Sequence, residues 1–111
     1  MKYMRKLVFA DTFGDDVKLA LKYIKHTLQA PKAADKVKIE IKKAYKKIKN
    51  RPFIYPIVSN DYLASMGFRF IKIKNFMLFY TVEEKEIHIV RFLYGRRDWV
   101  SILKNTSIIE N

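Results

Sequence analysis

A run of apolar residues near the end of the chain leads into a segment that combines arginines with a tyrosine. The segment reads Arg91-Phe92-Leu93-Tyr94-Gly95-Arg96-Arg97-Asp98-Trp99. A strand that ends here would fix the backbone while the side chains leave the sheet. Guanidinium groups are planar, permanently charged forks that suit phosphate. The segment therefore predicts a site for phosphate or another anion.

Three residues of this segment are candidates for catalysis: Tyr94, Arg91 and Arg97. Clustered arginines stabilise the negative charge that develops during phosphoryl transfer. Tyr94 could act as an acid or a base if neighbouring cations lowered its pKa from about 10. A structural alternative stays open, in which one arginine pairs with Asp98 and that acid caps the next helix.

The whole chain is strongly basic. Its 111 residues include 23 Lys and Arg against 11 Asp and Glu, which gives a formal net charge of +12. Such a balance is typical of proteins that bind nucleic acid, an acidic protein or an anionic membrane surface, and it does not choose among them. The chain has no Cys and 2 isolated His, so we expect no disulfide and no metal site.

The distribution of apolar residues indicates where the protein works. No apolar run approaches the roughly 18–20 residues that a membrane span needs. The basic N-terminal stretch is also followed by too short an apolar run for a secretory signal. We therefore expect a cytoplasmic protein without a membrane partner, built as a single domain over residues 1–111.

The N-terminal half predicts one strand and two helices. Residues 2–10 favour a strand. Apolar spacing predicts an amphipathic helix over 13–28, and Thr12 and Asp15 have the spacing of a capping box. A second helix is expected over 31–49, starting at a proline that the first helical turn tolerates. Because the connection is short, the two helices should form an antiparallel hairpin.

The second helix has a lysine-rich outer face, which is either a solvated surface or a contact for nucleic acid. Its lysines are Lys32, Lys36, Lys38, Lys42, Lys43, Lys46, Lys47 and Lys49.

The C-terminal half predicts an antiparallel meander of three strands. An irregular connector over 52–66 leads to strands at 67–74, 76–83 and 87–94. The third strand is apolar on both of its faces, which is typical of a central strand. A short helix over 98–104 closes the domain. The expected class is α+β, with an N-terminal strand, an antiparallel helical hairpin, a three-stranded antiparallel meander and a short C-terminal helix.

A tight turn at Lys74-Asn75 sets the register of the first two meander strands. It pairs Arg69 with Tyr80 and gives a nearly apolar face, which suits the floor beneath the two helices. The opposite face could stack bases or accept an apolar partner helix, or a C-terminal segment or a second copy could cover it. That face carries Phe68, Phe70, Lys72, Met77, Phe79 and Thr81.

These segments together resemble the RelE/ParE toxin superfamily. The resemblance rests on Phe68-Arg69, on the hairpin over 71–82 and on residues 89–99, whose Gly-Arg-Arg-Asp ending is similar to the ParE-like branch. It implies a RelE/ParE-like fold and the toxin of a type II toxin–antitoxin module, with a cognate, acidic antitoxin as partner. Many relatives cut mRNA on the ribosome, whereas others, in the ParE branch, poison DNA gyrase.

The resemblance also implies roles for individual residues. Lys72 and Lys74 lie where nuclease members often place basic residues, and Tyr94 matches a position that is His or Tyr in several relatives. Arg97 matches the arginine that follows the last strand. Two positions depart from the nuclease pattern. Met77 stands where an arginine is common, and Leu103 stands near the place of a late tyrosine.

The leading hypothesis from the sequence is ribosome-dependent mRNA cleavage. Tyr94 would be the acid or base, and Arg91 and Arg97 would stabilise the phosphate. The RNA would be positioned by Lys72, Lys74, Arg96 and Arg69. No cofactor is expected, because cationic side chains can replace a metal in attack by a 2′-hydroxyl. The alternatives are a ParE-like gyrase inhibitor without nuclease activity and a non-toxic basic domain that binds nucleic acid.

Overall fold

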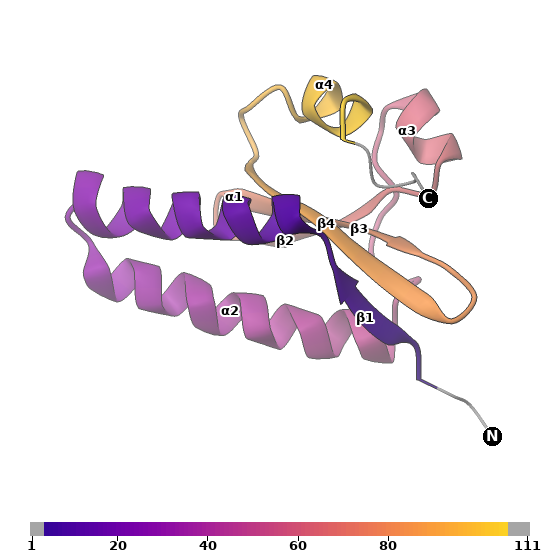
Figure 1. Cartoon of the computed structure of the whole chain (residues 1–111), viewed down its shortest axis with the longest axis horizontal. Coiled ribbons are helices and arrows are strands. Elements are labelled where there is room, and N and C mark those ends of the chain that lie inside the picture. The colour runs from indigo at the N-terminus through magenta and orange to yellow at the C-terminus, as the bar shows by residue number, and fades with distance from the viewer. Residues whose placement is uncertain (1–3, 107–111) are drawn as a thin grey trace.

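The computed structural model describes residues 4–106, and its elements follow the expected order (Figure 1). The chain is α+β, as predicted. Its elements are β1 (Lys6–Phe9), α1 (Asp11–Lys22), a π-helical segment (Tyr23–Thr27), α2 (Pro31–Asn50), α3 (Asp61–Ser65), β2 (Arg69–Ile73), β3 (Phe76–Val82), β4 (Glu86–Tyr94) and α4 (Trp99–Lys104).

The four strands form one mixed sheet in the order β1-β4-β3-β2. β3 pairs antiparallel with both of its neighbours, which confirms the meander, and β4 lies inside the sheet as expected. β1 adds a parallel pair on the outer side of β4, with Leu7 opposite Ile87. The antiparallel helical hairpin follows β1 in the chain, and the parallel pair places the first strand beside the last.

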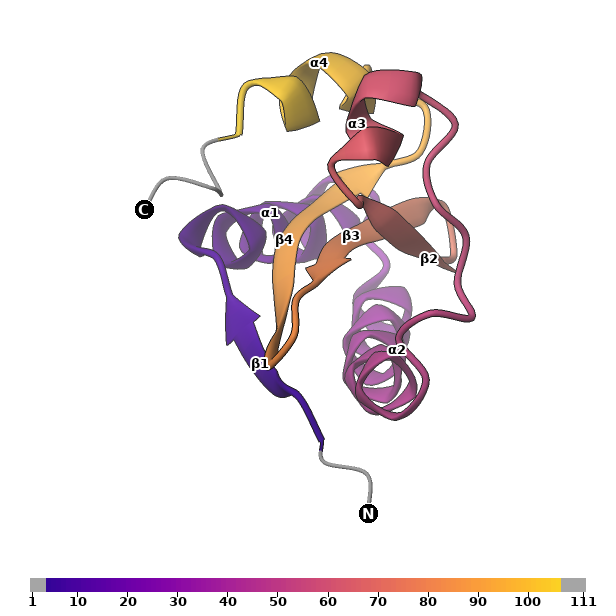
Figure 2. The same cartoon turned by 90° about the vertical axis from the view of Figure 1, so that its right-hand side faces the viewer.

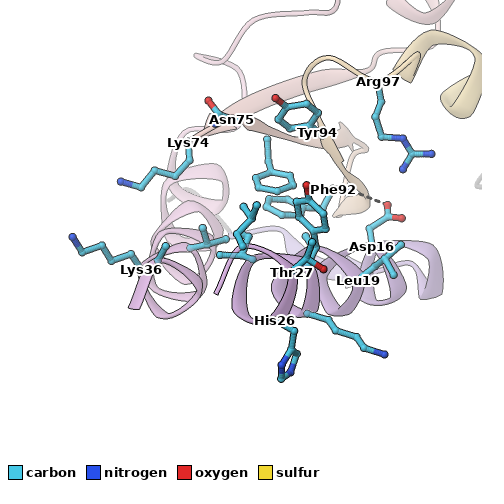
Figure 3. Close-up of a pocket in the computed structure, with 18 of the residues that line it drawn as sticks. Asp16, Leu19, His26, Thr27, Lys36, Lys74, Asn75, Phe92, Tyr94 and Arg97 are labelled. Atoms are coloured by element: carbon cyan, nitrogen blue, oxygen red, sulfur yellow. Dashed lines mark hydrogen bonds between the residues drawn. The ribbon is translucent and has the colours of Figure 1, made fainter. Parts of the chain in front are cut away.

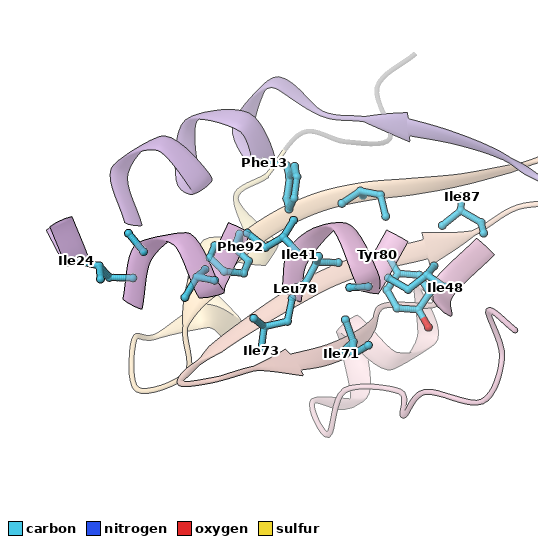
Figure 4. Packing of buried hydrophobic residues seen from close by; sticks show 14 residues of the cluster. Phe13, Ile24, Ile41, Ile48, Ile71, Ile73, Leu78, Tyr80, Ile87 and Phe92 are labelled. Carbon is cyan, nitrogen blue, oxygen red and sulfur yellow. The ribbon is translucent and has the colours of Figure 1, made fainter. Parts of the chain in front are cut away.

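The helical hairpin packs on one face of the sheet. Tyr80 and Leu78 of β3 are fully buried there, and they share a core with Ile41 and Ile48 of α2 (Figure 4). The register confirms the predicted turn, with Arg69 opposite Tyr80. Lys74 rather than Asn75 takes the left-handed backbone of this turn, at φ +56°.

The opposite face of the sheet is covered by α3 and α4, so the predicted stacking surface for bases is absent from it (Figure 2). Phe68 and Phe79 are 1% and 0% exposed. Leu103 of α4 and Leu63 of α3 are equally buried in this second core. The sequence analysis considered a C-terminal segment as one possible cover for this face. The structure shows that α4 near the C-terminus covers part of the face, and that α3 in the connector covers another part.

A β-bulge changes which side chains of β4 face the helical hairpin. Arg91 pairs with Phe79 and Ile89 pairs with Tyr80, so Val90 is the extra residue. Because a bulge inserts one residue into the alternation, the inward set changes parity along the strand. Ile89 and Phe92 both pack against the hairpin, and Val90 packs on the opposite face.

The first helix differs from its prediction at both ends. α1 begins at Asp11, and no side chain caps it. Thr12, expected to cap, instead donates its hydroxyl hydrogen to the carbonyl oxygen of Val90 at 2.8 Å. The α-helix ends at Lys22 and continues as the π-helical segment. After this change in pitch, Leu28 points away from the core and is 55% exposed.

The connector predicted over 52–66 is irregular up to Asn60 and then forms the short helix α3, and side chains hold it in place. The buried hydroxyl of Tyr80 donates to the carbonyl oxygen of Pro52 at 2.7 Å. Asn60 caps α3 by accepting from the backbone N–H of Leu63 at 3.0 Å. Gly67 follows α3 with φ +85°, a conformation that side chains disfavour.

Candidate functional site

A groove of about 1140 Å³ lies between the tip of the helical hairpin and the ends of β3 and β4 (Figure 3). Its walls are largely apolar, and its polar lining residues are mostly cationic. The larger apolar residues that line it are Leu19, Tyr23, Ile24, Leu28, Phe76 and Phe92. The basic residues that line it are Lys22, His26, Lys32, Lys36, Lys74 and Arg97.

Three predicted site residues meet at this groove: Tyr94, Arg97 and Lys74. Tyr94 leaves the end of β4 on the groove side, 39% exposed, with its ring edge-on to Phe76 at 5.9 Å between centroids. The backbone N–H of Arg97 donates to the carbonyl oxygen of Tyr94 at 3.0 Å, so a tight turn brings the two residues close along the backbone. Lys74 reaches the groove from the β2–β3 turn (Figure 3).

Gly95 allows these two segments to approach each other. Its N–H donates to the carbonyl oxygen of Asn75 at 2.8 Å. A Cβ at position 95 would lie 3.3 Å from that same oxygen, which is tighter than an ordinary contact. The glycine in the sequence segment thus holds the end of β4 against the turn that carries Lys74.

Arg91 does not join this group, because Asp16 of α1 engages its guanidinium. Arg91 Nε donates to Asp16 Oδ2 at 2.7 Å, and Nη2 donates to Oδ1 at 2.8 Å. Its Nη1 donates to the hydroxyl of Thr106 at 3.2 Å. The side chains are 17% and 10% exposed, so the pair is largely buried. The predicted convergence of Arg91 with the other arginines on one hollow is therefore wrong for this residue.

The carboxylate of Asp16 has a second task. Its Oδ2 also accepts the backbone N–H of Phe92 at 3.0 Å (Figure 3). One carboxylate thus joins α1 to two consecutive residues of β4, just after the bulge. Arg91 and Asp16 fix the hairpin to the sheet and so shape one wall of the groove.

The other predicted RNA-positioning residues lie apart from the groove. Arg69 donates to the carbonyl oxygens of Tyr55 and Phe53, at 2.6 and 3.2 Å, and so ties the connector to β2. Lys72 is exposed and pairs in the sheet with Met77, on the face that α3 and α4 cover. Arg96 is exposed beside Arg97 and does not line the groove.

Asp98 caps the last helix, as the structural alternative proposed. Its Oδ1 accepts the backbone N–H of Ser101 at 3.3 Å, and its Oδ2 accepts the hydroxyl of Ser101 at 2.8 Å. These hydrogen bonds to the ionised form lower the pKa of Asp98 below its usual value. No arginine within residues 4–106 pairs with Asp98, so Arg96 and Arg97 keep their charges toward solvent.

Sequence reasoning missed the apolar part of the groove. Leu19 and Tyr23 are 65% and 53% exposed, and they lie off the stripe that packs α1 into the core. With Asp16, they follow each other at helical spacing, which is a second stripe on the same helix. That second stripe is the signal from which the groove wall could have been found.

The charge of the groove is one-sided. Asp16 is the one acid among its described lining residues, and its carboxylate is already paired with Arg91. Over residues 4–106, no group of three acids or histidines is placed to hold a metal ion. In the same part of the chain, no helix is long and apolar enough to cross a membrane. The arrangement suits a partner that offers both apolar side chains and negative charge.

Comparisons with known proteins indicate the family and the fold of the chain. A family model described as the ParE toxin of the type II toxin–antitoxin system, parDE, matches residues 7–99. No curated protein sequence matches the chain. A solved structure titled "Chromosomal ParDE TA system from P. aeruginosa" superposes with a TM-score of 0.66 at 18% identity. The match covers 84% of this chain and 98% of that one, so the two share a fold.

Proposed function

Because the chain belongs to the ParE family of toxins from type II toxin–antitoxin systems, we propose that it acts by poisoning DNA gyrase. The ParE-like branch, which the ending of the sequence resembles, includes such poisons. In this reading the basic residues near the end of β4 serve binding to protein partners rather than phosphoryl transfer.

The pairing of Arg91 with Asp16 is the observation that carries the proposal. Cations placed around the reacting phosphate stabilise the transition state of RNA cleavage without a metal. Arg91 already donates to a carboxylate at 2.7 Å, and Arg69 donates to two backbone carbonyl oxygens. Met77 and Leu103 depart from the nuclease pattern at two further positions. A protein-directed toxin needs none of these groups to converge.

One observation favours mRNA cleavage as the second candidate. Tyr94, Arg97 and Lys74 line the same groove, so an RNA strand lying along it would contact a phenol and two cations. A ribosome-dependent nuclease would then use these three residues, which are fewer than the site residues predicted from the sequence.

Parallel assays separate the two activities. In the first, toxin is added to purified gyrase and supercoiled plasmid, and trapped cleavage complexes are measured as linear DNA. In the second, primer extension maps breaks in mRNA during translation. We expect linear DNA and intact mRNA. Breaks in mRNA that vanish in Arg97→Gln and persist in Arg96→Gln would reverse the assignment, because only Arg97 lines the groove. Inactivity in both assays would favour the non-toxic reading.

The groove is where we place the cognate antitoxin. Exposed apolar residues in a concave, cationic setting suit an acidic amphipathic segment. Leu19, Tyr23 and Leu28 offer the apolar contacts, each more than half exposed. Lysines at the rim offer complementary charge to carboxylates on the partner.

Calorimetric titration of the antitoxin tests this placement with a matched pair of variants. Leu19→Lys should weaken binding at least about tenfold, since burying one leucine contributes about 1.5–3 kcal/mol. Ile39→Lys is the control, because Ile39 is 53% exposed on α2 and lies outside the groove. Equal affinities for both variants would place the antitoxin elsewhere.

A further inference from the structure

The outward side of α2 carries a dense set of lysines beyond the groove. We call this set the lysine face. Its members are Lys38, Lys42, Lys43, Lys46, Lys47 and Lys49. All except the half-buried Lys49 are exposed, and none lines the groove. From Lys38 to Lys49 the helix rises by about 16 Å. We propose that the lysine face binds the phosphate backbone of duplex DNA.

The charge of this face is almost uncompensated within the protein. Over residues 4–106, its one ion pair joins Lys43 to Glu40 at 3.8 Å, between exposed side chains. Such a surface pair contributes little. Lys38, Lys42 and Lys46 follow one another at a spacing of four residues, where like charges repel by about 0.2–0.5 kcal/mol per pair. An external polyanion would relieve this repulsion.

The composition of the face selects the kind of polyanion. Single-stranded nucleic acid is usually held by stacking on aromatic side chains, and Tyr45, the aromatic residue of α2, packs instead against Phe9 at 5.0 Å between centroids. A protein partner needs apolar anchors, and the large exposed apolar residue on α2 is Ile39.

Two further observations narrow the choice. The apolar side of α2, with Val37, Ile41 and Ile48, is buried in the core and so cannot enter a lipid surface. Duplex DNA presents about one phosphate charge per 1.7 Å of its axis, a regular array that a straight row of lysines can follow.

The inference does not rest on the target proposed above, because it concerns another surface and needs no gyrase. Contacts limited to phosphates carry no base information, so binding should be independent of sequence. Such binding would hold the toxin on DNA while the groove stays open to a protein partner.

The test is fluorescence anisotropy of toxin with a labelled duplex of mixed sequence over a range of salt concentrations. The logarithm of the binding constant should fall linearly with the logarithm of salt concentration. The triple variant Lys38→Gln, Lys42→Gln, Lys46→Gln should reduce that slope by about 2.7, from about 0.9 for each lost phosphate contact. Glutamine keeps helix propensity nearly unchanged, and circular dichroism checks the fold.

A second triple variant controls for net charge. Lys18→Gln, Lys25→Gln, Lys85→Gln also lowers the formal charge from +12 to +9, using exposed lysines that are not part of α2. We expect its slope to stay within about one of the wild-type value.

The triple variant Lys38→Arg, Lys42→Arg, Lys46→Arg keeps the three charges and should preserve binding. It tests the role of charge even if the glutamine variant fails to fold. Equal loss of slope in both glutamine variants would overturn the proposal. Tighter binding of single-stranded DNA or duplex RNA at the same salt concentration would overturn it as well.

Discussion

Removing Asp16 alone should destabilise this toxin strongly, because its carboxylate is largely buried and joins α1 to β4. Asp16→Leu would leave the guanidinium of Arg91 without its carboxylate, in a site where that side chain is 17% exposed. It would also orphan the N–H of Phe92, which now donates to Asp16 at 3.0 Å. Breaking one side of a buried ion pair costs about 3–5 kcal/mol. Because water reaches part of this pair, we expect about 3 kcal/mol.

Replacing both partners should cost less than the two single changes together. Arg91→Met alone leaves a carboxylate that is 10% exposed without its cation, again at about 3 kcal/mol. The double variant Asp16→Leu, Arg91→Met removes both charges and keeps apolar volume at the site. Its remaining defect is the unpaired N–H of Phe92, at about 1–3 kcal/mol. The interaction energy of the cycle should therefore be about 3–5 kcal/mol in magnitude.

Urea unfolding followed by circular dichroism measures these free energies. Lys18→Ala, a change at an exposed position of the same helix, is the control and should shift stability by less than about 0.5 kcal/mol. The reasoning fails if the two single changes add to within about 0.5 kcal/mol, because the residues would then act independently. Arg91 would in that case be free to contact a substrate, and it would again be a candidate catalytic residue for mRNA cleavage.

Three further changes test the supports of the fold. Tyr80→Phe should cost about 1–2 kcal/mol in urea unfolding, because the carbonyl oxygen of Pro52 loses its donor. Burial raises the pKa of Tyr80 above its usual value. The unfolded chain therefore ionises first, and the stability of the wild type should fall more steeply above about pH 10 than that of the variant. Leu103→Ala, at a site 1% exposed, should cost about 2–5 kcal/mol and increase proteolysis of α4 if that helix seals the second core. Gly67→Ala should cost about 1 kcal/mol by thermal unfolding, since φ is +85° there; an unchanged melting temperature would contradict the strain.

Local signals in the sequence predicted most of the elements. The β2–β3 hairpin was placed in register from its two-residue turn, and Pro31 marked the first residue of α2. The floor beneath the helical hairpin followed from that register, since alternate residues of a strand share a face. The helix caps were harder to predict. Thr12 does not cap its own helix, because its hydroxyl donates to the carbonyl oxygen of Val90 on β4.

The candidate site was less predictable because it depends on contacts between distant residues. Arg91 and Asp16 are separated by 75 positions, and nothing near Arg91 in the sequence announces its partner. The bulge at Val90 also changes which β4 side chains face the hairpin, and no composition signal marked it. Tyr94 and Arg97 are near each other in the structure because only a short turn separates them.

Gyrase-mediated cleavage of supercoiled plasmid tests the central claim most directly, with wild-type toxin and the folded Asp16→Leu, Arg91→Met variant side by side. If the toxin targets gyrase and Arg91 only fixes β4 to α1, both proteins should produce linear DNA. Intact plasmid with both proteins, accompanied by mRNA breaks that require Arg91, would contradict the account.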